Sequence, residues 1–222
     1  MCSGFRPSAS GTTCLLGHDV TADAAAARAR RGLGRVFQNA RLFPSMTVRD
    51  AVSVSLDRWM DVREPLALAL RLRAARRTEA SLRRRVDELV HLGGLGDYAD
   101  VPIAHLSTGT RRLVELVAVV GFRPRVLLLD EPTAGIAQRE AEAVASTIEQ
   151  FRTELGISMV IVEHDIPMIS SIADRLICLD QGAVLSAGSP EEVLHDPRVL
   201  EAYVGGPVPE SEPETPAGIV AF

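Results

Sequence analysis

The sequence predicts an α/β fold in which a parallel sheet is covered by helices. In the second half of the chain, short runs that are apolar throughout alternate with longer stretches of helical periodicity. Strands without polar alternation are buried on both faces, as in parallel sheets. The composition agrees, with 46% hydrophobic and 24% charged residues. Only 4% are aromatic, so the core is expected to consist mainly of Leu, Val, Ile and Ala.

The first half of the chain contains fewer strand signals. Residues 10–17 are expected to form a short strand, and Thr21 is expected to cap a helix that continues to Arg31. A short apolar run at 33–37 predicts a buried strand. From Val48 onward apolar residues recur at helical spacing, which predicts a helical subdomain over about residues 48–120.

The second half alternates helix and strand in a regular order. Its final stretch, 206–222, is rich in Pro and Glu and is expected to be a disordered tail. The predicted helices are 107–120, 138–155 and 167–173, and the predicted strands are 126–129, 158–162, 175–179 and 183–187.

Composition also excludes several classes of protein. All 24 basic residues are Arg, so any mechanism that needs a lysine is closed to this sequence. The net charge of −5 argues against nucleic-acid binding, and the Arg-rich stretch 71–85 is interpreted as a solvated helix face. The three cysteines lack CxxC spacing and fit a reducing compartment. No run approaches the ~20 apolar residues of a membrane-spanning helix.

The strand predicted at 126–129 ends in two acids, Asp130 and Glu131. Ligands of parallel α/β sheets bind at the carboxyl ends of the strands, so both carboxylates are expected in a site. Asp130 is suited to hold Mg²⁺ through water, and Glu131 to orient a water molecule and take its proton. The alternative interpretation is a strand followed by an acidic turn.

A second candidate site is the start of a helix at Ser107, Thr108 and Gly109. Ser107 is a good N-cap, and the helix N-terminus offers N–H groups and a positive dipole end to a phosphate. The alternative is one capped amphipathic helix among many.

His164 and Gln38 are weaker candidates when each is taken alone. His164 follows the strand predicted at 158–162 and therefore lies at the same edge as Asp130 and Glu131, where an imidazole can hydrogen-bond a phosphoryl group. Gln38 follows an apolar run and can reach a metal ion or water through its side-chain carbonyl. Isolated residues of both types are usually structural or solvated.

Together, in this order and spacing, the four elements resemble the nucleotide-binding subunit of an ATP-binding cassette (ABC) transporter. Gln38 matches the Q-loop, residues 106–109 the signature motif, residues 127–132 the Walker B strand, and His164 the switch histidine. The resemblance implies a P-loop NTPase-type sheet with a helical subdomain.

Finer details resemble the branched-chain amino-acid importers within this family. The similar segments are 34–43, 133–136 and 196–205. The resemblance runs from about Ser3 to Gly205, which implies a partial ABC ATPase domain over residues 1–205.

Three departures from the family pattern stand out. Thr110 replaces the usual Gln or Glu of the signature, and residues 134–137 lack the aspartate of many relatives. A P-loop, GxxxxGK[ST], is absent, because the sequence has no lysine. Residues 1–7 align with the segment that normally follows the P-loop helix, so by the family pattern the first strands and the P-loop are missing and would precede Met1.

The resemblance assigns roles to the candidate residues. ATP and Mg²⁺ are the implied cofactors, with Glu131 as the base and His164 as the γ-phosphate sensor. Gln38 is the implied metal and coupling residue, Asp130 the Mg²⁺ partner, and Ser107 to Gly109 would contact ATP held by a second subunit. The implied activity is ATP hydrolysis that energises transport of branched-chain amino acids.

The resemblance also implies partners and a location. The partners would be integral-membrane permease subunits, a second ABC ATPase subunit, and indirectly a periplasmic or surface substrate-binding protein, with no nucleic acid. The chain would lie at the cytoplasmic face of the plasma membrane. The alternative is a truncated, catalytically incompetent interaction subunit that supplies its signature motif to an intact partner. A DNA-repair ATPase would need a long insertion for which the sequence has no room.

Overall fold

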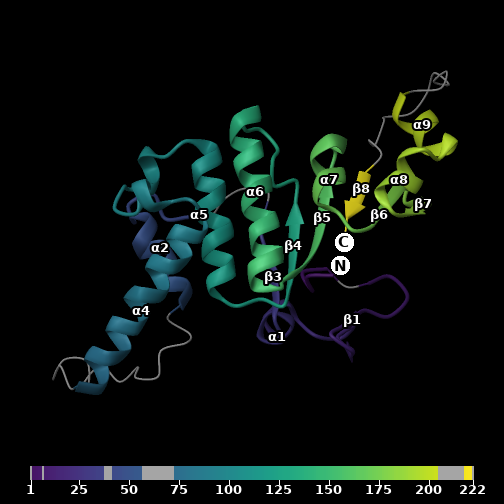
Figure 1. Ribbon diagram of the computed structural model, residues 1–222. Coiled ribbons are helices and arrows are strands. Elements are labelled where there is room, and N and C mark those ends of the chain that lie inside the picture. The colour runs from purple at the N-terminus through teal and green to yellow at the C-terminus, as the bar shows by residue number, and fades with distance from the viewer. Residues whose placement is uncertain (1, 7, 38–41, 57–72, 205–217, 222) are drawn as a thin grey trace.

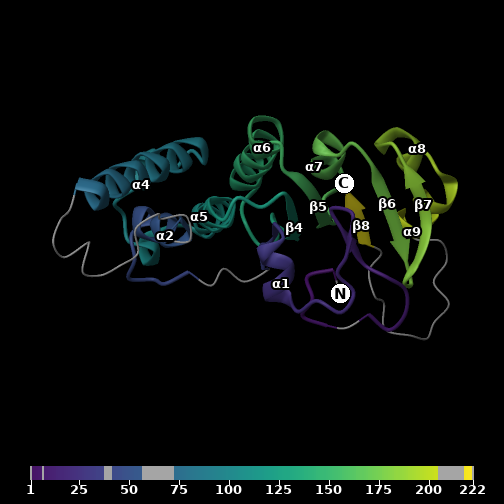
Figure 2. The same ribbon diagram turned by 90° about the horizontal axis from the view of Figure 1, so that it is seen from below.

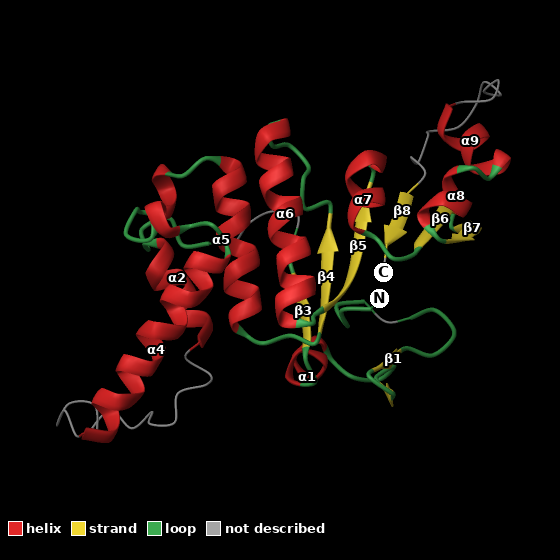
Figure 3. Ribbon diagram, in the orientation of Figure 1, coloured by secondary structure: helices red, strands yellow, loops and turns green. Residues whose placement is uncertain are grey.

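The computed structural model describes residues 2–6, 8–37, 42–56, 73–204 and 218–221, drawn in colour in Figure 1. Among them six strands form one sheet in the order β3-β4-β5-β8-β6-β7. Figure 3 shows these strands as a layer with helices packed around it. The strands are β3 (Leu33–Arg35), β4 (Val126–Asp130), β5 (Ser158–Glu163), β6 (Leu176–Asp180), β7 (Ala183–Gly188) and β8 (Gly218–Ala221).

The sheet is mostly parallel. β3 and β4 pair in parallel, as do β4 and β5. β8 runs antiparallel to both β5 and β6, so β5 and β6 point the same way. β7 is antiparallel to β6 and forms the edge. The predicted α/β fold class is confirmed, although two of the strands run against the others.

The strands are held by apolar side chains that face the helices. In β4, Leu127 and Leu129 are almost fully buried. Leu127 pairs with Gly34 of β3 on one side and with Met159 of β5 on the other. This register brings Asp130, the last residue of β4, opposite Val162 near the end of β5.

Helices cover the sheet from two sides. Figure 2 shows α6 (Gln138–Leu155) and α7 (Ile166–Ile172) on one face and α1 (Ala25–Arg30) on the other. α6 ends at Gly156, whose φ of +63° is left-handed and whose N–H donates to the carbonyl of Arg152. Two further helices, α8 (Pro190–Leu194) and α9 (Pro197–Val204), pack beside β7.

The regular structure described between residues 48 and 121 is helical. Val52 and Leu116 from this region belong to the same apolar core as Leu127 of the sheet. The helices are α2 (Val48–Leu56), α4 (Arg73–Leu92) and α5 (Thr108–Gly121), with 3-10 turns at Gly96–Tyr98 and Ile103–His105. The helical character predicted for about 48–120 is therefore found, while its status as a separate subdomain stays a prediction.

The N-terminal prediction is wrong in two details. The expected strand at 10–17 is a two-residue strand, β1 (Cys14–Leu15), paired with β2 (His18–Asp19). Thr21 does not cap α1, because its hydroxyl accepts a hydrogen bond from the Thr13 N–H at 2.8 Å and its own N–H donates to Asp19. The helix begins four residues later, at Ala25, without a side-chain cap.

The expected tail also differs from the structure. Gly218–Ala221 form β8 inside the sheet, so the prediction of disorder for 206–222 is wrong for these four residues. The sequence there is short and apolar, and it finds backbone partners on two strands. Residues 206–217 and 222 lie outside the described residues.

Two expectations about the surface can be compared with the described residues. Arg83 and Arg84 of α4 are exposed, and Arg83 pairs with Glu79 one turn away, as predicted for a solvated face. Within the described part of the chain, no helix combines the length and the apolar character needed to cross a bilayer.

Candidate functional site

The carboxyl ends of β4 and β5 bring two of the predicted site residues together. Glu131 directly follows β4, and its N–H donates to the carbonyl of Val162 in β5 at 2.8 Å. His164 directly follows β5, with Nδ1 3.9 Å from Oε1 of Glu131. The parallel register of β4 and β5 therefore places a carboxylate beside an imidazole at one edge of the sheet.

Glu131 has an unusual backbone conformation. Its φ of +46° lies in the left-handed region, which costs a residue with a side chain roughly 1–2 kcal/mol. Such conformations cluster at functional sites, where the surrounding structure enforces them. The side chain of Glu131 is 36% exposed and that of His164 is 64% exposed, so a ligand in solution can reach both.

A second glutamate, Glu163, connects the loop after β4 to the loop after β5 from the buried side of the sheet edge. Its side chain is fully buried and accepts hydrogen bonds from the N–H of Thr133 at 2.9 Å, from the Thr133 hydroxyl, and from the N–H of His164 at 3.1 Å. Thr133 lies two residues after Glu131. Glu163 therefore fixes the loop that carries Glu131 relative to the loop that carries His164.

Sequence reasoning missed this role, although a signal was present. Glu163 follows Met159 and Ile161 at a spacing of two residues, so it lies on the buried face of β5. A carboxylate on a buried face needs hydrogen-bond donors.

Asp130, the predicted Mg²⁺ partner, is engaged by an arginine. Its carboxylate lies 3.2 Å from the guanidinium of Arg35 at the end of β3. Arg35 also donates to the hydroxyl of Ser3 at 2.8 Å and lies 5.0 Å from the centre of the Phe37 ring. Asp130 is half-exposed, so the pair stays accessible to solvent.

The donors at this edge fit Mg²⁺ only in part. Carboxylate oxygens are the ligands that Mg²⁺ prefers, and the cation commonly takes one or two of them together with phosphate and water. Arg35, however, competes for the oxygen of Asp130. Among the described residues, no group of three or more His, Cys, Asp or Glu side chains is arranged to hold a metal. Gln38, the other predicted metal residue, lies outside the described residues.

A buried ion pair on α5 anchors the segment that leads to Gln38. Arg112 donates to the carbonyl of Phe37 at 2.8 Å and pairs with Glu115 at 3.1 Å. Both side chains are less than a tenth exposed. Burial raises the pKa of Glu115, while Arg112 and a backbone hydrogen bond from Phe37 oppose this shift. No sequence pattern predicts that this pair is buried, because an i,i+3 pair is usually a surface feature of a helix.

Ser107, Thr108 and Gly109 lie apart from the first group, at the amino end of α5. Ser107 caps the helix by accepting the Thr110 N–H at 3.1 Å, as predicted. Its hydroxyl donates to the carboxylate of Glu140 in the first turn of α6. A Cβ atom at Gly109 would lie 2.5 Å from the Glu140 side chain, so glycine is required here. The carboxylate of Glu140 thus covers part of this helix end, where a phosphate would be expected.

Comparison with known proteins identifies similar chains. The family model described as ABC transporter matches residues 1–134, and the model described as branched-chain amino acid ATP-binding cassette transporter matches residues 183–208. The high-affinity branched-chain amino acid transport ATP-binding protein BraF of Pseudomonas aeruginosa is 31% identical over 91% of this chain and 79% of its own length. LivG of Salmonella typhimurium, a protein of the same description, is 31% identical over 80% of this chain and 69% of its own.

Solved structures show the same fold. A nucleotide-free ATP-binding cassette from an ABC transporter matches with a TM-score of 0.73 at 23% identity, over 92% of this chain and 81% of its own. The cbiO1 protein of Clostridium perfringens, described as part of the ABC transporter complex cbiONQ, matches with a TM-score of 0.72 at 27% identity, over 90% of this chain and 74% of its own.

Proposed function

The chain belongs to the ATP-binding subunits of ABC transporters, and from that premise we propose that it energises the import of branched-chain amino acids. Two relatives with this substrate in their names support the proposal, as does the match of a branched-chain family model near the end of the domain. The site is the edge at which β4 and β5 end.

The observation that carries the proposal is the meeting of Glu131 and His164. Their side chains lie 3.9 Å apart, are open to solvent, and are supported from below by buried Glu163. In the proposed reaction Glu131 orients a water molecule and accepts its proton, and His164 contacts the γ-phosphate. Both are roles that a side chain at a strand end can perform without further movement of the sheet.

Asp130 and Gln38 would hold Mg²⁺ with the nucleotide. When bound, the cation neutralises phosphate charge. Arg35 contacts Oδ2 of Asp130, so Mg²⁺ would bind through the other carboxylate oxygen or after Arg35 releases Oδ2 and turns its positive charge toward the phosphates. The Arg35–Asp130 pair is partly exposed to solvent, so breaking it costs little free energy.

Ser107, Thr108 and Gly109 would contact a nucleotide that is held mainly by a second ABC ATPase subunit. The helix N-terminus of α5 provides N–H groups for a phosphate. Glu140 has to turn away for that contact to form, because its carboxylate accepts the Ser107 hydroxyl at this helix end and would repel a phosphate there.

The domain division follows from this function. We assign residues 1–205 to a partial ABC ATPase domain with a helical subdomain over about 48–120, which carries the signature motif. Residues 206–222 follow that domain in the sequence, and Gly218–Ala221 among them add a strand to its sheet.

Permease subunits at the cytoplasmic face of the plasma membrane are the proposed docking partners. Phe43 supports this assignment, because its side chain is 67% exposed in the loop that follows Gln38. Single exposed aromatic side chains can anchor an interface. A substrate-binding protein outside the membrane would act on the permeases and reach this chain only through them.

The test is ATP turnover and leucine uptake by the chain assembled with its permease subunits. Glu131→Gln keeps the shape but cannot accept the proton, so both rates should fall by about 10²–10⁴. Glu142→Gln on the exposed side of α6 is the matched control and should stay within about two-fold of the parent. Turnover by Glu131→Gln within a few-fold of the parent would rule out Glu131 as the base.

The second candidate is an interaction subunit that does not hydrolyse ATP. It is favoured by one observation, the lack of lysine and of GxxxxGK[ST] in the sequence beside an intact Ser107 to Gly109 segment. Titration of the chain with ATP, alone and with its partner subunit, distinguishes the ATP-hydrolysing subunit from the interaction subunit. The interaction subunit binds ATP only in the presence of an intact partner, and Glu131→Gln leaves the turnover of that complex unchanged.

A further inference from the structure

The amino ends of α5 and α6 meet at a carboxylate that has no role in the reaction proposed above. Figure 1 shows the two helices side by side, and they pack against each other. Glu140 lies in the first turn of α6, and its Oε1 atom accepts a hydrogen bond from the hydroxyl of Ser107, the N-cap of α5. A negative group of this chain therefore lies where α5 begins.

The contact is close because the residue of α5 that faces Glu140 is a glycine. A Cβ atom at Gly109 would lie 2.5 Å from the Cβ and Cδ atoms of Glu140 and 2.7 Å from its Oε2 atom. Gly109 is buried, whereas Ser107 and Thr108 are exposed. With no side chain at position 109, the carboxylate can lie against the first turn of α5, where the helix dipole attracts an anion.

The carboxylate of Glu140 is not neutralised by a cation in the described part of the chain. None of the ion pairs found there includes Glu140. Its stabilisation at this place therefore comes from the Ser107 hydroxyl and from the positive end of the α5 dipole. These are the groups that a phosphate would use at the same helix end.

The Ser107 hydroxyl can donate to only one acceptor at a time. It carries a single hydrogen, which it donates to Glu140, while its oxygen accepts the Thr110 N–H at 3.1 Å. The Thr110 hydroxyl, 2.9 Å away, is then left to donate to Ser107. As long as Glu140 holds this hydrogen, Ser107 cannot donate to a phosphate. A phosphate that binds here has to displace the carboxylate from the hydroxyl and from the end of the helix.

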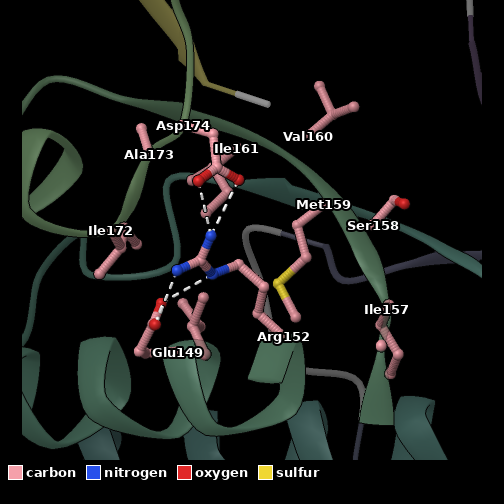
Figure 4. Close-up of a pocket in the computed structure, with 12 residues that line it drawn as sticks. Glu149, Arg152, Ile157, Ser158, Met159, Val160, Ile161, Ile172, Ala173 and Asp174 are labelled. Carbon is pink, nitrogen blue, oxygen red and sulfur yellow. Dashed lines mark hydrogen bonds and ion pairs between the residues drawn. The ribbon is translucent and has the colours of Figure 1, made fainter. Parts of the chain in front are cut away.

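The rest of α6 is held in place, so Glu140 leaves this contact by rotation of its own side chain. Figure 4 shows Arg152, in the last turn of α6, held by Glu149 and by both oxygens of Asp174, each at 2.8 Å. Three further residues of α6 are buried in the core, namely Val144, Ile148 and Phe151. Glu140 itself is only partly buried. Exchange of its carboxylate for another anion is therefore local and leaves the sheet unchanged.

We propose that Glu140 is an autoinhibitory residue, whose carboxylate occupies the amino end of α5 until a phosphate of the nucleotide displaces it. The inference rests on the proposed function for its ligand, the triphosphate end of ATP held by a second ABC ATPase subunit. Binding of that phosphate releases Glu140, and departure of the nucleotide lets Glu140 return to Ser107. Glu140 thereby raises the ATP concentration that is needed to bring the two subunits together.

The first test uses the intact chain and inorganic tripolyphosphate at constant ionic strength, and it needs neither ATP nor a partner. The amide signal of Gly109 in isotope-labelled protein reports binding at the amino end of α5. Glu140→Gln removes the charge at nearly constant shape, so we expect it to bind tripolyphosphate about three- to tenfold more tightly than the parent. Glu142→Gln makes the same change on the exposed side of α6 and should bind like the parent. Equal dissociation constants for the two variants, or no saturable shift in Glu140→Gln, would overturn the proposal.

A second measurement tests the contact between Glu140 and Ser107 in the absence of any ligand. Ser107→Ala and Glu140→Ala, alone and combined, are compared by urea denaturation. Because the two side chains share one hydrogen bond, Glu140→Ala should lower the urea midpoint of the parent at least about twice as much as that of Ser107→Ala. Additive effects of the two substitutions would overturn the proposal, because Glu140 would then not hold the Ser107 hydroxyl in solution.

The last test measures ATP turnover by the chain assembled with its permease subunits and a second ATPase subunit. Glu140→Gln should lower the KM for ATP about three- to tenfold and leave kcat within about two-fold, because it removes a competitor of binding and leaves Glu131 and His164 unchanged. Glu142→Gln should keep the KM of the parent. An unchanged or raised KM in Glu140→Gln would overturn the proposal. A parent complex without turnover would instead count against the proposed function, and the tripolyphosphate titration would then decide on Glu140.

Discussion

Glu131 and Glu163 occupy equivalent places at the ends of neighbouring strands, yet their surroundings are opposite. Glu131 is a third exposed and has a left-handed backbone, although both carboxylates lie near Nδ1 of His164, that of Glu131 at 3.9 Å and that of Glu163 at 3.6 Å. Glu163 is fully buried, with three hydrogen-bond donors around its carboxylate. One strand end thus presents its carboxylate to solvent, and the other uses its carboxylate to hold loops in place.

The same contrast separates two regions of the molecule. The exposed edge consists of Asp130, Glu131 and His164, and the buried supports consist of the Glu163–Thr133 contact and the Arg112–Glu115 pair. The exposed edge carries the proposed reactive side chains, and the buried supports determine where those side chains lie. We therefore expect substitutions in the supports to lower stability more than substitutions at the edge, with the reverse order for turnover.

The largest expected effect on stability comes from Glu115→Ala. The substitution removes the carboxylate that pairs with the buried guanidinium of Arg112. We expect the free energy of unfolding to fall by about 3–5 kcal/mol. Urea denaturation measures the loss. Arg83, which pairs with Glu79 on the exposed side of α4, is the control, and Arg83→Ala should cost less than about 1 kcal/mol.

A double substitution sharpens this prediction. Arg112→Met combined with Glu115→Leu removes both charges and should recover most of the lost stability, because the penalty arises from the unpaired charge. A double variant as unstable as Glu115→Ala would show that the contact of Arg112 with the Phe37 carbonyl, at 2.8 Å, is the larger contribution.

The next effect is expected at Glu163. Glu163→Ala leaves the buried donors of Thr133 without an acceptor, at about 1–3 kcal/mol for each unsatisfied group. Glu163→Gln keeps one carbonyl oxygen and should lose less. Thermal unfolding of both variants checks the order, and equal stability of Glu163→Ala and the parent would contradict the supporting role.

The sequence predicted the exposed edge better than the supports. Asp130, Glu131 and His164 lie one or two residues after apolar runs, so their position at one sheet edge could be inferred from parallel pairing alone. The helix at Gln138–Leu155 was predicted to the residue, since its periodicity is strong and Gly156 ends it. Long periodic elements of this kind need no knowledge of tertiary contacts.

The supports escaped prediction because they depend on tertiary contacts. Glu163 and Thr133 are 30 positions apart, and Arg112 reaches Phe37 across 75. Thr21 shows the same difficulty at short range, since its hydroxyl accepts the Thr13 N–H and does not cap a helix. The position of β8 was unpredictable for a further reason, because no local pattern tells a short apolar segment which strands it will join.

A smaller effect is expected from the backbone of Glu131. At a φ of +46° a glycine avoids the clash that a Cβ atom suffers, so Glu131→Gly should be more stable than Glu131→Ala by about 1 kcal/mol. Both variants lack the carboxylate and should turn over ATP equally slowly. A Glu131→Ala variant as stable as Glu131→Gly would mean that the loop relaxes out of the left-handed region.

The smallest expected effect is a difference in pH dependence between the parent and Glu115→Gln. Burial raises the pKa of Glu115 above its ordinary value of 4.5, although Arg112 and Phe37 oppose the shift. Below the ordinary value Glu115 is protonated in both the folded and the unfolded chain. As the pH rises, the unfolded chain loses this proton first, so stability falls until the pH has passed the raised pKa of the folded chain. Glu115→Gln has no proton to lose, and the loss of its ion pair with Arg112 lowers stability by an amount independent of pH. Urea denaturation across this window should therefore show the parent losing stability relative to Glu115→Gln as the pH rises. A parent that gains stability relative to the variant would mean that Arg112 outweighs burial at Glu115.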